Sequence, residues 1–203
     1  MSNAASRQNQ QQLSAFIWSV ADLLRGDFKQ SDYGKVILPF TVLRRLDCVL
    51  ESTKAQVLAE HEDKTAKGIP SEPFLTRAAK QTFYNTSPLD LGKLLGDQDH
   101  IRQNLYAYIQ AFSPEVRDIF ERFDFFTQVE KLAKANLLYL VTEKFAAIDL
   151  HPSVIDNGQM GLVFEELIRK FAEISNETAG EHFTPREVIR LMVNLLFIED
   201  DDV

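Results

Sequence analysis

Apolar side chains recur every three or four residues along almost the whole chain, and this spacing constrains the fold more than any other feature. Five stretches carry the repeat, at residues 13–24, 32–60, 99–112, 127–147 and 157–175. A stripe with this period lies on one face of an α-helix. No stretch shows the apolar and polar alternation of a half-buried strand. The sequence therefore predicts an all-α protein, a multi-helix bundle with polar connections.

Glycine, proline and polar residues predict where these helices end. Gly26 is expected to end the first helix. Pro39 predicts a kink within the second stretch, or its division into two helices at that point. Residues 61–73 are polar and include one glycine and two prolines. We therefore predict a loop there, followed by a short helix at about 74–80.

Two serine–proline pairs predict two further helix starts. Ser87-Pro88 precedes a leucine-rich segment at 89–95, and Ser113-Pro114 precedes an apolar segment at 116–123. Serine is a favoured N-cap residue, and proline at the first helical position loses no hydrogen bond. Each pair is therefore expected to open a helix.

The charge balance limits what the chain can bind by itself. Its 203 residues include 22 Lys and Arg against 30 Asp and Glu, which gives a formal net charge of −8 at pH 7. Duplex DNA is bound largely by cationic side chains that neutralise phosphates. This balance opposes DNA binding by the segment alone. It also disfavours an autonomous helix-turn-helix protein, because no basic recognition helix is found.

The rest of the composition is that of an ordinary soluble domain. Hydrophobic residues make up 45% of the chain, and fifteen phenylalanines predict a substantial aromatic core. Cys48 is the one cysteine, and its place in an apolar run predicts a buried thiol rather than a nucleophile. No apolar run reaches transmembrane length, and the polar N-terminus lacks a signal-peptide core. We therefore expect a cytoplasmic protein without membrane contact.

Residues 180–196 contain every local signal of a helix start. Thr184 is predicted to be the N-cap, Pro185 the first helical residue, and Glu187 the partner that completes a Thr-x-x-Glu capping box. The apolar residues that follow at helical spacing are Val188, Leu191, Met192 and Leu195. Local physics favours a well-capped helix that binds nothing. The alternative is a helix N-terminus whose free N–H groups bind an anion or a carboxylate.

Other patterns associated with catalysis or metal binding do not form. The eight glycines never give Gly-x-Gly, which excludes a dinucleotide-binding fingerprint. Four scattered histidines and one cysteine make a poor metal-binding set. Arg44-Arg45 could contact phosphate or a carboxylate, but a solvated or salt-bridged helix face is the preferred interpretation. Neither a Gly-rich cofactor turn nor an Asn-Pro-Pro-aromatic tetrad for an extruded adenine occurs in the sequence.

Three blocks of sequence resemble the modification subunit of type I restriction–modification systems. The first reads ADLLRG at 21–26, YGKVILPF at 33–40 and LRRLD at 43–47. The second reads MGLVFEELIR at 160–169, and the third is the segment 180–196. Their order and spacing are similar to the N-terminal helical domain of this N6-adenine DNA methylase family. The resemblance implies methyl transfer from S-adenosylmethionine to adenine N6 in DNA.

The chain is accordingly expected to divide into three parts. Residues 1–12 are predicted to be a disordered polar N-terminus, and residues 13–178 the N-terminal helical domain. Residues 179–203 are predicted to be the truncated start of the S-adenosylmethionine-dependent methyltransferase domain, before its α/β core. Because the Gly-rich turn and the Asn-Pro-Pro-aromatic site are missing, this segment alone is predicted to be inactive.

The resemblance also implies which residues face the cofactor. Phe183-Thr184-Pro185 corresponds to the part of the family that lines the cofactor pocket, so these three residues are assigned to S-adenosylmethionine contact. Glu181 and His182 are assigned to the same contact. No catalytic residue and no metal ligand is assigned. Binding of S-adenosylmethionine is expected to need the missing downstream domain.

The implied partners are the other subunits of the same system. A specificity subunit would read the DNA target, a restriction subunit would cleave unmodified DNA, and a second methyltransferase subunit is also compatible with the resemblance. DNA would be reached through the complex, and the helical domain would contribute to subunit contacts. The alternative interpretation is a stand-alone helical protein-interaction module that shares the architecture without catalysis.

Overall fold

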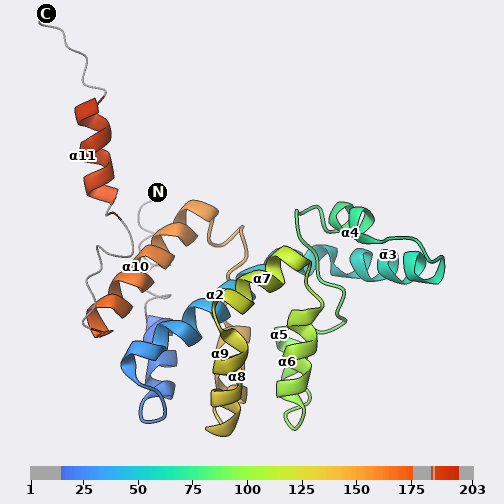
Figure 1. Cartoon of the computed structure of the whole chain (residues 1–203), viewed down its shortest axis with the longest axis horizontal. Helices are drawn as coiled ribbons and strands as arrows, with labels where there is room; N and C mark the ends of the chain where they lie inside the picture. The colour runs from blue at the N-terminus through green and yellow to red at the C-terminus, as the bar shows by residue number, and fades with distance from the viewer. Residues whose placement is uncertain (1–14, 176–183, 185, 197–203) are drawn as a thin grey trace, which may run out of the picture.

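The computed structural model describes residues 15–175, 184 and 186–196, and these residues are mostly α-helical (Figure 1). The first described helix spans 15–24, and α2 spans Tyr33–Leu50. The others are η1 (Gln30–Asp32), η2 (Glu51–Thr53), α3 (Lys54–Ala66), α4 (Glu72–Ala79), α5 (Leu91–Leu94), α6 (Ile101–Gln110), α7 (Pro114–Arg122), α8 (Phe125–Lys134), α9 (Leu138–Ala147), α10 (Asn157–Ser175) and α11 (Arg186–Leu196). Across these residues the β-type pairing amounts to two isolated bridges. The all-α prediction is confirmed.

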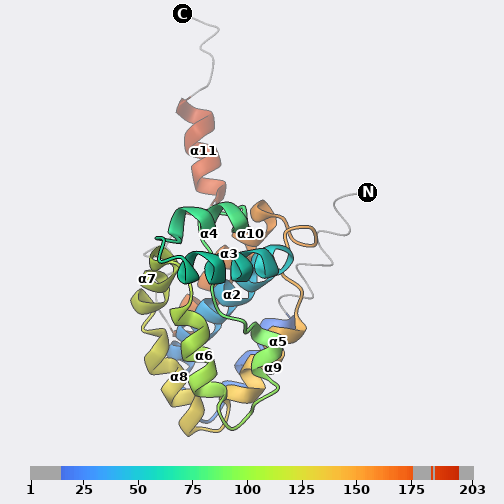
Figure 2. The ribbon, with the colours of Figure 1, turned by 90° about the vertical axis from the view of Figure 1, so that its right-hand side faces the viewer.

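α2 is the central element of the bundle. It packs against α8 and α9 on one side and α10 on the other (Figures 1 and 2). Its Phe40 is fully buried and meets two further rings, Phe145 stacked at 5.1 Å and Phe125 edge-on at 5.0 Å between ring centroids. Phe16 of the first helix adds a third contact, edge-on to Phe145 at 5.1 Å. The predicted aromatic core is therefore confirmed, with Phe40 near its centre.

The predicted loop at 61–73 is wrong, because α3 continues to Ala66. Two ion pairs stabilise the polar end of this helix, and the partners in each pair lie one helical turn apart. Lys64 pairs with Glu60 at 3.0 Å, and Lys67 pairs with Asp63 at 2.5 Å. Gly68, at a φ of 64°, ends the segment. α4 then packs back on α3, and the two helices form a hairpin at one end of the molecule (Figure 1). The short helix predicted at 74–80 is α4.

Two of the predicted helical stretches are each divided into two helices. In the stretch that contains Pro39, the division does not lie at that proline. The stretch 32–60 is interrupted at η2, where the Thr53 hydroxyl donates to the carbonyl of Leu50 at 3.2 Å. Pro39 instead lies inside the continuous α2, whose burial offsets a cost of about 3 kcal/mol. The stretch 127–147 is divided at Asn136, which has a φ of 57°. Asparagine tolerates this left-handed conformation better than most residues.

The two serine–proline predictions have different outcomes. Ser113-Pro114 does precede a helix, α7, although the Ser113 hydroxyl is buried and makes no cap bond. Ser87-Pro88 does not open one, because α5 begins only at Leu91. Its N-cap is Asp90, whose Oδ1 accepts from the backbone N–H of Lys93 at 2.7 Å. Carboxylate capping by Asp90 therefore replaces the predicted serine cap.

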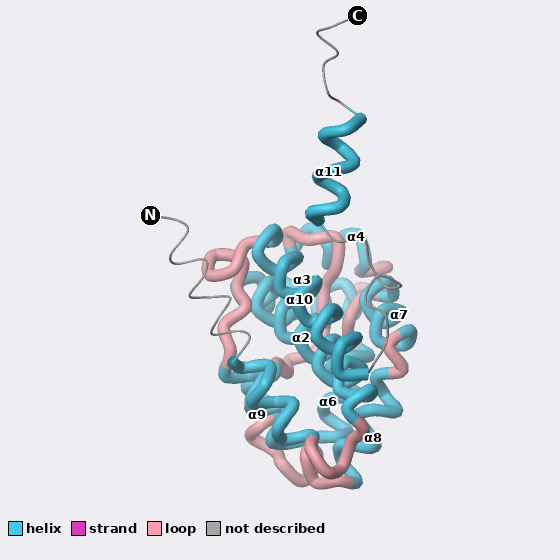
Figure 3. Tube along the Cα trace, turned by 90° about the vertical axis from the view of Figure 1, so that its left-hand side faces the viewer, coloured by secondary structure: helices cyan, strands magenta, loops and turns pink. Residues whose placement is uncertain are grey.

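α10 confirms the helix predicted at 157–175 and joins the bundle along α2 (Figure 3). Gly34 lies so close that a Cβ added there would be 3.3 Å from Cδ2 of Phe171. The ammonium group of Lys170 lies 5.6 Å from the ring centroid of Trp18. By contrast, α11 stands apart from the bundle (Figures 1–3). None of the helices described is both long and apolar enough to span a bilayer.

Candidate functional site

The segment predicted to contact the cofactor is described only at Thr184. This residue is exposed and lies two positions before the first residue of α11. Glu181, His182, Phe183 and Pro185 lie outside the described residues. Their assignment to the cofactor therefore stays a prediction, as does the capping role of Thr184. The helix predicted to follow them is present as α11.

α11 exposes an unusually apolar surface. Its exposed apolar side chains are Val188, Ile189, Leu191, Met192, Val193, Leu195 and Leu196. Leu195 is 64% exposed and Leu196 is 75% exposed. The polar residues of its sequence (Arg186, Glu187, Arg190 and Asn194) recur at helical spacing on one side, so the apolar residues form one broad face, which in an amphipathic helix normally packs against other elements. Exposed apolar patches of this kind mark surfaces that other elements cover. α11 therefore has the pattern of an amphipathic helix whose apolar face is uncovered among the described residues.

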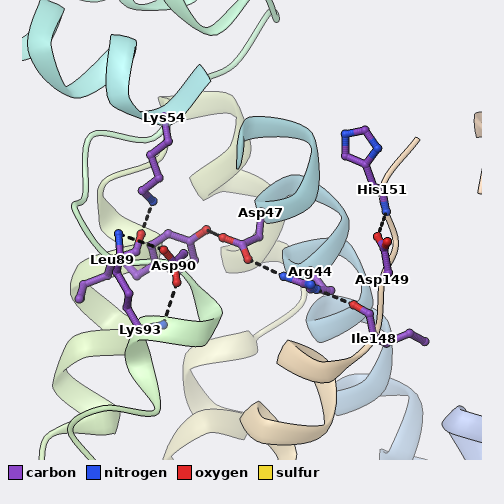
Figure 4. A network of polar contacts seen from close by, with 10 residues as sticks. Arg44, Asp47, Lys54, Leu89, Asp90, Lys93, Ile148, Asp149 and His151 are labelled. Atoms are coloured by element: carbon purple, nitrogen blue, oxygen red, sulfur yellow. Dashed lines mark hydrogen bonds and ion pairs between the residues drawn. The ribbon is translucent and has the colours of Figure 1, made fainter. Parts of the chain in front are cut away.

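A second candidate lies at the C-terminal end of α2, where a cavity of about 470 Å³ is lined by α2, α3, α5, α6, α9 and the segment before α5 (Figure 4). Its charged lining residues are Arg44, Asp47, Glu51, Lys54, Asp90 and Lys93. The lining contains neither serine, cysteine nor histidine. Among the residues the structure describes, no three side chains of the types that bind metals gather into a cluster.

Asp47 is the centre of the polar contacts in this cavity (Figure 4). Its side chain is 8% exposed, and both of its oxygens are used. Oδ1 accepts from the hydroxyl of Tyr108 at 2.6 Å, and Oδ2 accepts from Nη1 of Arg44 at 2.9 Å. Burial, followed by the neighbouring Asp47 charge, raises the pKa of Tyr108 well above its ordinary value, so this hydroxyl stays a donor. The carboxylate thus joins α2 to α6.

Lys54 forms another wall of the cavity at the start of α3. Its ammonium group donates to the carbonyl of Leu89 and lies 5.0 Å from the ring centroid of Tyr108. Burial lowers the pKa of Lys54, although the charges of Asp47 and Asp90 partly oppose this effect. The side chain connects α3 to the segment before α5, and the cation–π contact adds to that connection.

Asp90 and Lys93 complete the opposite wall. Beyond its capping bond, Asp90 pairs through Oδ2 with Nζ of Lys93 at 3.1 Å, and the same ammonium donates to the carbonyl of Pro88 at 3.0 Å. Asn85 connects the segment before α5 to α6, because its amide donates to the carbonyl of Tyr108 at 2.9 Å. These polar groups bind one another. The arrangement therefore forms a polar junction between α2, α3, α5 and α6.

The interpretation of Arg44-Arg45 as a solvated or salt-bridged face is correct for one residue only. Arg44 forms the predicted salt bridge, with Asp47. Arg45 is 9% exposed, so the prediction of a solvated face is wrong for it. Its guanidinium donates to the carbonyls of Leu150 and Ile155 and to the side chain of Asn157. The spacing of three residues between Arg44 and Asp47 was the one local signal of these contacts, and it indicated only the salt bridge of Arg44.

Cys48 is confirmed as a buried thiol. It is 1% exposed on α2, and burial raises its pKa, which leaves it protonated and unreactive near neutral pH.

Comparison with known proteins defines the class to which this helical bundle belongs. Residues 13–145 match the family of the HsdM N-terminal domain, and residues 156–203 match a second family, the N-6 DNA methylases. The chain belongs to the HsdM N-terminal domain family.

A relative in Methanocaldococcus jannaschii is described as "Type I restriction enzyme MjaIX methylase subunit". It is 20% identical over 208 aligned residues, and the match covers 92% of this chain. The chain spans 36% of the length of that relative. No solved structure matches the chain. The resemblance to the N-terminal region of type I methyltransferase subunits is therefore confirmed.

Proposed function

We propose that this chain is the N-terminal part of a longer subunit that transfers a methyl group from S-adenosylmethionine to adenine N6 in DNA. The observation that carries the proposal is the order of the two family matches on one chain. A helical domain at 13–145 is followed at 156–203 by a match to N-6 DNA methylases. Methyl transfer to a DNA base requires a cofactor pocket and an extruded base, which the remainder of that domain would supply.

The helical domain then serves assembly rather than chemistry. The whole 203-residue chain has a formal net charge of −8, which opposes binding to phosphates by this chain alone, so in this proposal DNA is reached through other subunits. The partners in this proposal are a specificity subunit that selects the target, a restriction subunit and, in the complete complex, a second methyltransferase subunit. The M. jannaschii relative carries the name of a type I restriction enzyme subunit, which supports this choice of partners.

The segment before α11 contributes one edge of the cofactor pocket in this proposal. Thr184 is exposed, as a residue that contacts a ligand must be before the ligand binds. In this proposal the rest of the methyltransferase domain covers the apolar surface of α11. The relative is nearly three times as long as its aligned part, which leaves enough chain for such a domain. Glu181, His182, Phe183 and Pro185 remain proposed cofactor contacts together with Thr184.

Replacing Thr184 by alanine in the longer subunit is expected to weaken S-adenosylmethionine binding. Loss of one hydrogen bond of about 1 kcal/mol corresponds to a roughly fivefold higher dissociation constant. The variant should also lose a helix cap worth about 1 kcal/mol of folding stability. Isothermal titration calorimetry measures the first effect and thermal unfolding the second. Thr184→Ser, which keeps the hydroxyl, is the matched control, and unchanged affinity in a folded Thr184→Ala variant would remove Thr184 from the pocket.

A further inference from the structure

The segment 148–156 connects α9 to α10 and covers most of the gap between the two family matches. The match to the HsdM N-terminal domain ends at residue 145, and the match to N-6 DNA methylases begins at residue 156. A connection between two domains is often flexible, with few contacts across it. In this protein the connection is instead bound to the central helix α2.

Two adjacent arginines of α2 hold the backbone of this segment. Nε of Arg44 donates to the carbonyl of Ile148 at 2.7 Å (Figure 4). Nη1 of Arg45 donates to the carbonyls of Leu150 at 2.5 Å and Ile155 at 2.7 Å. Three carbonyls spread over eight residues are thereby fixed to one turn of α2. Hydrogen bonds from a charged donor stabilise more than neutral ones.

The same segment is rigid in itself. Its turn is closed by the amides of Val154 and Ile155, which donate to the carbonyl of His151 at 2.9 and 3.0 Å. The side chain of Asp149 accepts from the backbone N–H of His151 at 2.8 Å. Leu150 is fully buried and Ile155 is 5% exposed, so two side chains anchor the segment in the core. Little conformational freedom remains between α9 and α10.

Arg45 also reaches the first turn of α10. Its Nη2 donates to Oδ1 of Asn157 at 2.8 Å. Asp156, which precedes Asn157, forms a reciprocal capping box with Gln159. Asp156 Oδ1 accepts from the backbone N–H of Gln159 at 2.8 Å, and Gln159 Oε1 accepts from the backbone N–H of Asp156 at 3.0 Å. The N-terminal end of α10 is therefore fixed in position and direction by its own cap and by Arg45.

We propose that Arg45, assisted by Arg44, is a positioning residue for methyl transfer. It fixes the start of α10, where the match to N-6 DNA methylases begins, against α2, and so places the cofactor pocket relative to the DNA held by the assembled complex. This proposal rests on the function proposed above. Holding reacting groups in the correct geometry contributes strongly to rate, and a displacement of about 1 Å can reduce the rate about 100-fold.

The test uses the longer methyltransferase subunit assembled with its specificity subunit. Arg45→Gln removes the charge and the fork of donors, while Arg45→Lys keeps the charge but not the fork. Arg122→Gln is the matched control, because Arg122 is an exposed arginine that pairs with Asp118 on the surface of α7. Three quantities are measured: the dissociation constant of S-adenosylmethionine, the rate of DNA methylation at saturating cofactor, and a distance distribution between nitroxide labels at Glu121→Cys and Leu162→Cys. Both label sites are exposed.

Arg45→Gln is expected to lower the methylation rate about 10- to 100-fold, to leave cofactor affinity unchanged, and to broaden the label distance distribution. Arg45→Lys should be intermediate, and Arg122→Gln should match the wild type in all three measurements. If Arg45→Gln fails to fold, Arg45→Lys decides. A wild-type distance distribution and rate in a folded Arg45 variant would overturn the proposal, and so would a loss of cofactor affinity equal to the loss of rate. If the wild-type complex does not methylate DNA, the proposed function fails, while the distance distribution still tests whether Arg45 positions α10.

Discussion

Replacing Phe40 by alanine is expected to lower the free energy of unfolding by about 3–5 kcal/mol. Phe40 is fully buried on α2, where its ring meets the rings of Phe125 and Phe145. The substitution removes apolar area from the core and leaves a cavity that α2, held on both sides by other helices, cannot easily close. It also removes two aromatic pairs worth about 0.5–1.5 kcal/mol each beyond burial.

Urea unfolding followed by circular dichroism measures this loss. Phe74→Ala is the matched control, because Phe74 lies on α4 and is 37% exposed. Its ring contacts the ammonium of Lys64, at 4.6 Å from the centroid, so the control should lose only about 1 kcal/mol. Equal losses in the two variants would show that the centre of the core does not lie at Phe40.

Replacing Asp47 by alanine is expected to cost about 3–5 kcal/mol, because it breaks a buried pair and leaves one partner uncompensated. Arg44, whose side chain is 17% exposed, would lose its only carboxylate partner among the described residues. The buried Tyr108 hydroxyl would lose its acceptor at the same time. Both effects leave a donor away from water, which costs more than the original bonds contributed.

The matched control for Asp47→Ala is Asp118→Ala on α7. Asp118 also pairs with an arginine, Arg122, at 2.8 Å, but its side chain is 52% exposed. A surface pair of this kind contributes about 0–1 kcal/mol. Chemical denaturation of both variants measures the difference. A loss below about 1 kcal/mol for Asp47→Ala would show that the cavity at the end of α2 is wet and that the junction contributes little.

Local patterns predicted the helices whose signals lie within a few residues. α10 was predicted at 157–175 with the observed bounds, and Gly26 ends the first helix at a φ of 99°. The predictions failed where local signals were ambiguous. The polar residues at 61–66 indicated a loop, but ion pairs one turn apart maintain a helix there. Asn136 gave no stronger signal than any exposed polar residue, although it ends a helix.

The candidate site was less predictable than the fold because its contacts join distant parts of the chain. The hydroxyl of Tyr108 and the carboxylate of Asp47 are 61 positions apart in sequence, and Arg45 contacts carbonyls more than 100 residues away. No local spacing indicates such pairs. The cofactor assignment of Glu181, His182, Phe183, Thr184 and Pro185 came from family resemblance, and it remains a prediction that the Thr184 variants test.

The most direct test of the central proposal is methyl transfer by the complete subunit together with its specificity subunit. Unmethylated DNA is incubated with S-adenosylmethionine carrying an isotopically labelled methyl group, and the digested nucleosides are identified by mass spectrometry. We expect labelled N6-methyl-2′-deoxyadenosine, formed at a defined DNA sequence and absent when the specificity subunit is omitted. A folded, assembled complex that leaves adenine unlabelled, or that labels cytosine instead, would contradict it.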